Sequence, residues 1–165
     1  MGMHENLGVF QDAADIIDAD GYSTKFIDMA AVIPKLGVGA HAPMLCIRMV
    51  IPSTTAADTL AIEFRQSASV DVDTDGGVLN GTVITVFMPF CAAAGAEIRA
   101  DDARCAAGVW MWRAPLPYGV NLRYAQLYWQ NATHTGHFHV DAWLEDAAES
   151  NFRGSQVLVS PVGNP

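Results

Sequence analysis

Apolar and polar residues alternate with a period of two along most of this chain, a pattern typical of β-strands that bury one face. The alternation is clearest at residues 59–65, where Leu60, Ile62 and Phe64 take every second position. Other runs are shorter, or are rich in β-branched and aromatic side chains. Together these patterns predict strands over 25–29, 44–50, 59–65, 82–90, 109–113, 122–130, 137–144 and 156–159.

Turn residues separate these runs, and helical periodicity is scarce. Residues 10–17 are predicted to form one or two helical turns. The Ala-rich connection over residues 90–109 is predicted to be a short helix or an exposed contact loop. Because about eight strands follow one another without intervening helices, we expect an all-β protein, an antiparallel β-sandwich or jelly roll.

The length of 165 residues fits one domain, and a domain of this size needs neither a disulfide nor a metal to hold its core. We place the core of this single domain, residues 1–165, at about residues 22–146. Residues 1–21 are then an N-terminal arm. Residues 147–165 form a C-terminal arm that docks on a neighbouring molecule or adds a strand to its own sheet.

Charge changes this picture by excluding one class of partner. Only 16% of the residues are charged, below the roughly 25% typical of soluble domains. Such a surface favours a protein that works against a partner or against copies of itself. The net charge of -9 supplies no positive field, so we expect no binding of nucleic acid. The acidity suits a basic protein face or simple solubility.

The sequence shows no signal for export or for a membrane. Residues 1–10 lack a basic segment followed by an apolar core, and the apolar stretches fall short of the roughly 18 residues that span a bilayer. We therefore expect synthesis and first assembly in the cytoplasm. The odd number of cysteines favours free thiols, with Cys46 buried in an apolar run. A pairing of Cys91 with Cys105 across a loop stays open.

Histidines are concentrated near the last predicted strand. On a strand, His137, His139 and Asp141 point to the same face, where imidazole and carboxylate groups can bind a divalent metal. Jelly-roll metalloenzymes of the cupin type also need a histidine on a later strand, and none follows His139. We interpret this face as polar or partner-facing, and a metal site stays open as the alternative.

An acidic segment resembles the start of a calcium-binding loop. The residues from Asp71 to Gly76 place oxygen ligands at positions one, three and five and glycine at position six. Position twelve, which should be a bidentate glutamate, is Thr82. We interpret the segment as an acidic hairpin loop, with a weak calcium site shared with another chain as the alternative.

Aromatic residues cluster in the second half of the chain. Trp110 and Trp112 are predicted to share one strand face. Such residues are core, anchors of a protein interface, or platforms for sugars. No nucleophile motif, phosphate loop or acid/base pair accompanies them, so we expect no enzyme activity and no cofactor. The cluster comprises Trp110, Trp112, Tyr118, Tyr124, Tyr128 and Trp129.

The order of several segments resembles that of the jelly-roll cement proteins that decorate the capsids of short-tailed bacteriophages, the Bordetella phage cement protein type. No single segment is specific, and their shared order over residues 9–146 carries the resemblance. Residues 90–117 and the tail beyond residue 145 depart from it. The matching segments are 10–14, 23–29, 36–39, 44–50, 60–67, 121–124 and 136–144.

The resemblance implies a structural virion protein without an active site. Such a protein binds the outer capsid surface between major capsid subunits and stabilises the expanded shell. It implies self-association, for which we expect a homodimer, with a trimer as the alternative. We expect residues 91–107 and 147–165 to contact the shell. A cupin-like metal-binding protein and a carbohydrate-binding β-sandwich module are the alternative functions.

Overall fold

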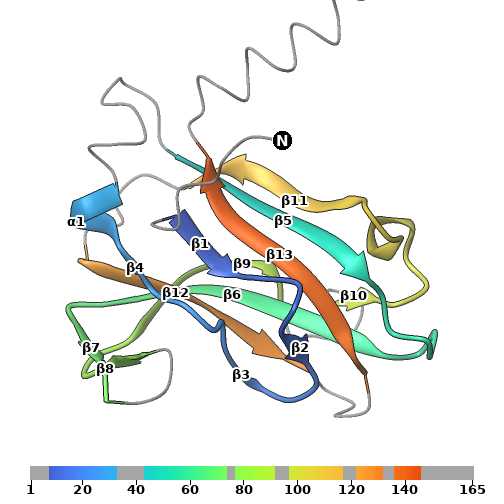
Figure 1. The fold of residues 1–165 in the computed structure, drawn as a ribbon, viewed down its shortest axis with the longest axis horizontal. Helices are drawn as coiled ribbons and strands as arrows, with labels where there is room; N and C mark the ends of the chain where they lie inside the picture. The colour runs from blue at the N-terminus through green and yellow to red at the C-terminus, as the bar shows by residue number, and fades with distance from the viewer. Residues whose placement is uncertain are drawn as a thin grey trace, which may run out of the picture.

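Two antiparallel sheets pack face to face around one apolar core (Figure 1). This arrangement confirms the predicted all-β sandwich, and jelly-roll connectivity stays a prediction. The computed structural model describes residues 8–32, 43–73, 77–91, 97–116, 122–131 and 136–145.

The first sheet, sheet 1, is built around the last strand of the described chain. β13 lies between β1 and β5, β11 pairs with the other side of β5, and β2 also pairs with β13. All these pairs are antiparallel. The bounds are β1 Val9–Gln11, β2 Ile16–Ile17, β5 Met44–Ile51, β11 Trp110–Pro115 and β13 Phe138–Glu145.

The second sheet, sheet 2, is built around a long central pair, β6 and β12. β9 and β10 pair with β6, and β3 and β4 pair with β12. A separate hairpin, β7 with β8, leads from β6 to β9. The bounds are β3 Gly21–Tyr22, β4 Ile27–Asp28, β6 Thr59–Ser67, β7 Ser69–Asp71, β8 Val78–Asn80, β9 Ile84–Phe90, β10 Ile98–Arg99 and β12 Tyr124–Gln130. The short helices are α1 Met29–Val32 and the 3-10 helix Ala103–Cys105.

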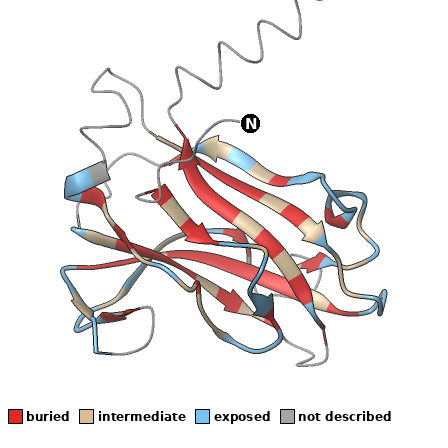
Figure 2. Cartoon of the chain, in the orientation of Figure 1, coloured by how far each residue is buried: buried red, intermediate tan, exposed pale blue. Residues whose placement is uncertain are grey.

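The core follows the period-two pattern of the sequence. Along β5, β6 and β13 the apolar residues at every second position are buried in the core. Figure 2 shows the buried residues of these strands in red. The central strand β6 is buried on both faces, because its Ala61 and Glu63 are covered as well. The predicted strands 44–50, 59–65, 82–90, 109–113, 122–130 and 137–144 are confirmed, with ends that shift by a few residues. The predicted strand 25–29 is reduced to the two residues of β4, because α1 begins at Met29.

The N-terminal prediction was wrong in its local structure. Residues 10–17 do not form helical turns, because they supply β1 and β2, which pair with β13. Phe10 and Ile17 are buried in the core cluster, so the core includes residues of the segment 1–21 expected as an arm. Strands of two or three residues carry no readable period, and their pairing with β13 is long-range. For the same reason β3, β7, β8 and β10 were not predicted.

The connection over residues 90–109 contains a short helix, one of the two forms predicted. The Asp102 carboxylate accepts a hydrogen bond from the Arg104 backbone N–H at 2.8 Å and so caps the 3-10 helix. Cys105 on this helix is buried in the core, and β10 pairs with β6. The predicted strand 156–159 and the C-terminal arm 147–165 lie outside the described residues.

Candidate functional site

Two residues of the predicted histidine face, His139 and Asp141, lie on β13 and contact the turn between β1 and β2. The Asp141 Oδ1 atom accepts the Ala13 backbone N–H at 2.9 Å, and Asp141 Oδ2 pairs with Arg48. The Nδ1 atom of His139 lies 2.7 Å from the Ala13 carbonyl oxygen. Since a carbonyl only accepts, Nδ1 carries the proton and donates it. The partners of these two residues are the Ala13 backbone and the Arg48 side chain, which agrees with the interpretation of a polar face.

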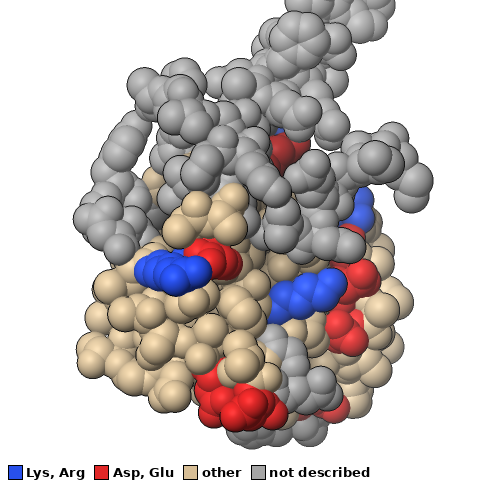
Figure 3. All heavy atoms as spheres, turned by 60° about the vertical axis from the view of Figure 1, so that its left-hand side comes forward, with Lys and Arg blue, Asp and Glu red and all other residues tan. Residues whose placement is uncertain are grey.

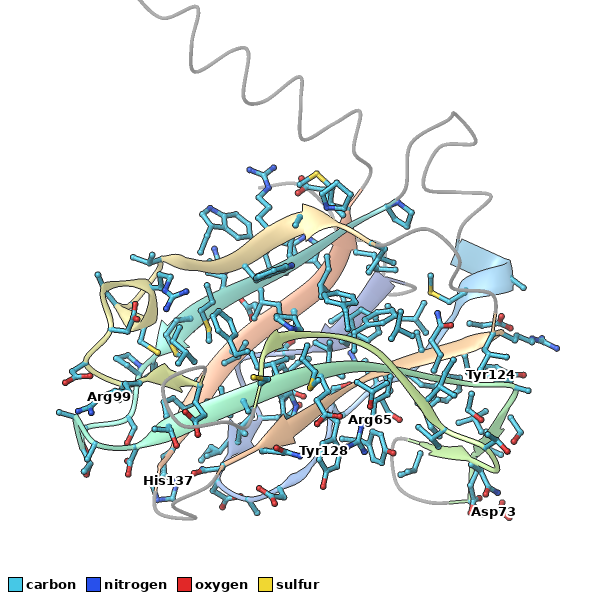
Figure 4. The ribbon with its side chains drawn as sticks, turned by 180° about the vertical axis from the view of Figure 1, so that it is seen from behind. Arg65, Asp73, Arg99, Tyr124, Tyr128 and His137 are labelled. Carbon is cyan, nitrogen blue, oxygen red and sulfur yellow. The ribbon has the colours of Figure 1, made fainter. Side chains whose placement is uncertain are left out.

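The metal alternative gains no support in the described residues. Both Asp141 oxygens already accept hydrogen bonds, and His137 is exposed just before β13 begins. Within the described ranges, no three His, Cys, Asp or Glu side chains lie close enough to hold a metal ion. In the labelled view from behind, His137 and Asp73 lie far apart along the lower edge (Figure 4).

The acidic segment forms a hairpin, as predicted. Asp71 pairs with Val78 across β7 and β8, and the Asp71 Oδ1 atom accepts the Asp73 backbone N–H at 3.0 Å. Gly77 closes the loop with φ +76°, a conformation that favours glycine, and a Cβ there would lie 2.6 Å from the Phe26 ring. Residues 74–76 lie outside the described residues, so calcium binding stays an alternative.

Trp110 and Trp112 do not share a face, which corrects the sequence prediction. β11 carries a bulge between them, so that Trp110 pairs with Arg48 and Trp112 pairs with Ile47 on β5. Neighbouring residues on β5 point to opposite faces, and so do the two tryptophans. A bulge has no period signature, and this is why the alternation rule failed.

Trp112 is a core residue. Its ring lies 6.3 Å from Phe87 and 6.1 Å from Phe90, both on β9 of the opposite sheet. It therefore joins the two sheets at the edges formed by β11 and β9. Among the other aromatic residues of the cluster, Trp129 is buried, whereas Tyr118 lies outside the described residues.

Trp110 lies on the outer face of sheet 1, where it is 40% exposed. Its ring centroid is 5.3 Å from that of Trp143, and the Arg113 guanidinium is 5.1 Å from the Trp110 ring. Arg48 lies 5.9 Å from the Trp143 ring. We call these four residues, Trp110, Trp143, Arg48 and Arg113, the Trp110 patch.

The charges in the Trp110 patch are balanced by the neighbouring strand. Arg48 pairs with Asp141 and Arg113 pairs with Glu145, both on β13. The arginines are thereby held against the tryptophan rings, and the patch carries no net charge with these two partners included. Such a surface can bind an apolar or aromatic partner group without leaving a buried charge unpaired.

The outer face of sheet 2 carries a second ordered cluster, which the sequence analysis missed. The Arg65 guanidinium lies 3.6 Å from the Tyr128 ring centroid and donates to Glu63 Oε2 at 2.7 Å. Glu63 also accepts from Thr85 at 3.0 Å and from Gln130 at 3.2 Å. Figure 4 shows Arg65 and Tyr128 side by side. The only available signal was the i, i+2 spacing of Glu63 and Arg65, which puts both on one strand face.

Every arginine of the described ranges forms an ion pair with a carboxylate. In two of these pairs the arginine lowers the pKa of its carboxylate partner. Hydrogen bonds from Arg123 lower the pKa of Asp28, and those from Arg104 lower the pKa of Asp102 to about 2. The net charge of -9 therefore comes from acids in excess of these pairs. Figure 3 shows acidic side chains gathered at the lower edge and right-hand side of one face.

The two buried thiols, Cys46 and Cys105, are unreactive at neutral pH. Burial raises the pKa of Cys46 to about 12, helped by Glu145, whose Oε2 atom accepts the thiol at 3.3 Å. Burial also raises the pKa of Cys105 to about 12. A thiol with so high a pKa forms little thiolate, the reactive species, at neutral pH. Cys46 is buried, as predicted, and neither residue has the character of a catalytic nucleophile.

These two thiols predict a loss of stability at alkaline pH. Above the ordinary thiol pKa of 9.0 the unfolded chain releases protons that the folded chain keeps up to about pH 12. The free energy of unfolding should therefore fall by about 1.4 kcal/mol per pH unit for each thiol in this window. Urea unfolding at several pH values measures the slope. The Cys46→Ala/Cys105→Ala double variant should show a clearly shallower slope, and an unchanged slope would contradict the assignment.

No protein-family model matches the chain, and comparison with curated proteins and with solved structures finds no significant match. Within the described residues, no helix is long and apolar enough to cross a membrane.

Proposed function

We propose that this chain is a structural protein that decorates the outer surface of a bacteriophage capsid and stabilises the expanded shell. The observation that carries the proposal is the Trp110 patch. A large aromatic ring stays 40% exposed on the outer face of a sheet whose neighbouring arginines are neutralised. Tryptophan and arginine are the residues that most often anchor protein interfaces. The order of segments over residues 9–146, which resembles that of capsid cement proteins, supports the same function.

The sheet edges add a second kind of contact surface. β9 pairs with β6, and its Ile84 and Met88 are exposed. No charged residue occurs from residue 76 to residue 96, so the usual means of protecting an edge strand with lysine is missing here. Exposed edges can accept a strand from a capsid subunit or from a second copy of this chain. This supports the proposed partners, the major capsid protein and a homodimer.

The proposed action is passive. Apolar contacts across a joint between capsid subunits add buried area, and occupation of many equivalent joints multiplies a modest affinity. The acidic surplus favours a basic shell surface, which would raise the association rate at low salt. No proton, electron or group transfer takes part.

The test is a binding experiment with shells. Expanded capsids of the phage that encodes the chain are mixed with purified protein and pelleted, and the bound copies are counted. We expect saturation at a fixed ratio to the major capsid protein. Trp110→Ala should weaken binding about thirtyfold, the effect of losing about 2 kcal/mol at an interface anchor. Val72→Ala, on an exposed residue of the distant β7–β8 hairpin, is the matched control and should bind normally.

Either result is decisive. If the protein does not bind shells at micromolar concentration, the decoration proposal is wrong. If it binds and Trp110→Ala binds equally well, decoration stands and the Trp110 patch is not the contact. Thermal unfolding of each variant separates lost contact from lost fold.

A second candidate function rests on the same residue. A half-exposed tryptophan on an open sheet face is also a platform on which a sugar ring can stack. Quenching or a blue shift of tryptophan fluorescence with a panel of glycans, lost in Trp110→Ala, would favour a carbohydrate-binding module. The decoration proposal predicts no such response.

A further inference from the structure

The turn between β8 and β9 contains the only asparagine of the sequence that is followed by glycine, Asn80-Gly81. Both residues are exposed. Gly81 has φ +73°, a left-handed conformation that glycine adopts readily. Because glycine has no side chain, no Cβ hinders its backbone nitrogen. The Gly81 backbone N–H donates a hydrogen bond to the Asn80 side-chain Oδ1 atom at 2.6 Å. This hydrogen bond holds the side-chain amide of Asn80 beside the backbone nitrogen of Gly81.

Two serines act on the peptide bond that joins these residues. The Ser69 hydroxyl donates to the Asn80 carbonyl oxygen at 2.8 Å, and the Ser67 hydroxyl donates to the same oxygen. When the Gly81 nitrogen loses its proton, the negative charge is shared with this oxygen. Two hydroxyl donors aimed at an oxygen where charge develops stabilise that anion, as donors of an oxyanion hole do. A Gly81 nitrogen in this setting should lose its proton more readily than one whose Asn80 carbonyl lacks these donors.

We propose that Asn80 is a site of spontaneous deamidation, activated by the hydroxyls of Ser67 and Ser69. The Gly81 nitrogen loses its proton to water and forms a bond to Asn80 Cγ. The side-chain amide takes up a proton and leaves as ammonia, which closes a succinimide ring. Water then opens the ring at either carbonyl and yields aspartate or isoaspartate. No oxidant, metal or other protein is required, and the reaction is independent of what the chain binds.

The product changes the hairpin. Either product adds one negative charge, and isoaspartate also lengthens the main chain by one carbon. Asn80 pairs with Ser69 in the β7–β8 ladder, and its carbonyl holds both serines. Isoaspartate would displace this carbonyl and loosen the hairpin. Deamidation would therefore change the structure of the β7–β8 hairpin slowly and irreversibly.

Asn131 is an internal comparison. It precedes alanine, is fully buried, and donates through Nδ2 to the Gly136 carbonyl at 2.7 Å. The bulkier following residue and the fixed side-chain amide disfavour ring closure, so Asn131 should stay unmodified while Asn80 reacts.

The experiment is a time course on the folded full chain at physiological temperature and mildly alkaline pH. Peptide mass spectrometry locates the exchange of NH2 for OH, and an isoaspartyl methyltransferase assay counts the isoaspartate. We expect modification at Asn80, and none in Asn80→Ser. Ser69→Ala should slow the reaction about fivefold, the effect of one neutral hydrogen bond. Ser69→Thr, which keeps the hydroxyl, should restore the rate. Thr82→Ala, at an exposed neighbour, should leave it unchanged.

The same variants in urea separate activation by the fold from the reactivity of the sequence. In the unfolded chain all of them except Asn80→Ser should react at one rate, because the serine contacts are absent. Deamidation at Asn80 in urea and none in the folded chain would overturn the proposal. Equal folded rates for the native chain, Ser69→Ala and Ser67→Ala would overturn the role of the hydroxyls.

Discussion

Replacing Phe10 with alanine is expected to lower the free energy of unfolding by about 3–5 kcal/mol, a large part of the 5–15 kcal/mol that is typical of a domain. Phe10 is 0% exposed, and its ring meets Phe64 of the opposite sheet edge-to-face at 5.9 Å. Phe64 in turn stacks on Phe87 at 5.3 Å, so the cavity would open in an aromatic row that joins β1, β6 and β9. Urea unfolding followed by circular dichroism measures the loss.

The matched control lies in the same short segment. Ile16 is 52% exposed, and Ile16→Ala should change stability by less than about 0.5 kcal/mol. Phe10→Leu keeps most of the volume and should cost clearly less than Phe10→Ala. If Phe10→Ala were as stable as the native chain, Phe10 would belong to the N-terminal arm 1–21 that the sequence predicted, and its place in the core would be wrong.

Replacing Gln126 with leucine is expected to cost about 3 kcal/mol, although the two side chains are similar in size. Gln126 is fully buried on β12. Its Oε1 atom accepts the Leu79 backbone N–H at 3.1 Å, and its Nε2 atom donates to the carbonyls of Ser23 at 2.7 Å and Gly77 at 3.1 Å. Leucine would leave these buried backbone groups without hydrogen-bond partners, and each unsatisfied group costs about 1–3 kcal/mol.

This loss should appear locally before it appears globally. Hydrogen exchange should quicken first in the β7–β8 hairpin, because Gln126 fastens that hairpin to sheet 2. Gln130→Leu is the control, since this half-buried residue of the same strand has one described bond, to Glu63. It should cost about 1 kcal/mol and leave hairpin exchange unchanged. Equal effects of both variants would refute the special role of Gln126.

The long strands could be predicted because their signal is local. In β5, β6 and β13 every second residue is apolar, and the pleat alone places those side chains on one face. The acidic hairpin was likewise readable, since the acidic residues and glycines from Asp71 to Gly77 interrupt the apolar runs. Burial of Cys46 followed from the apolar residues on both sides of it. These conclusions needed no knowledge of which strands become neighbours.

The candidate surfaces could be predicted only in part, because they depend on pairing. The bulge in β11 turns Trp110 outward and Trp112 inward, and nothing in the sequence around them marks a bulge. Asp141 and His139 were correctly placed on one strand face. Their partner, the Ala13 backbone, is more than a hundred residues away along the chain, so no local pattern could reveal it.

Three features could be concluded from the sequence without the fold: the all-β sandwich, the positions of its long strands and the acidic sign of its surplus charge. Hydrophobic period and composition are local properties of the sequence, and they do not depend on how distant segments pack. Three others required the fold: residues 9–17 belong to sheet 1, Gln126 connects the β7–β8 hairpin to sheet 2, and Trp110 reaches the surface. Each of these features depends on contacts between segments that are distant in the sequence. Such contacts stabilise the protein only once the chain has brought those segments together.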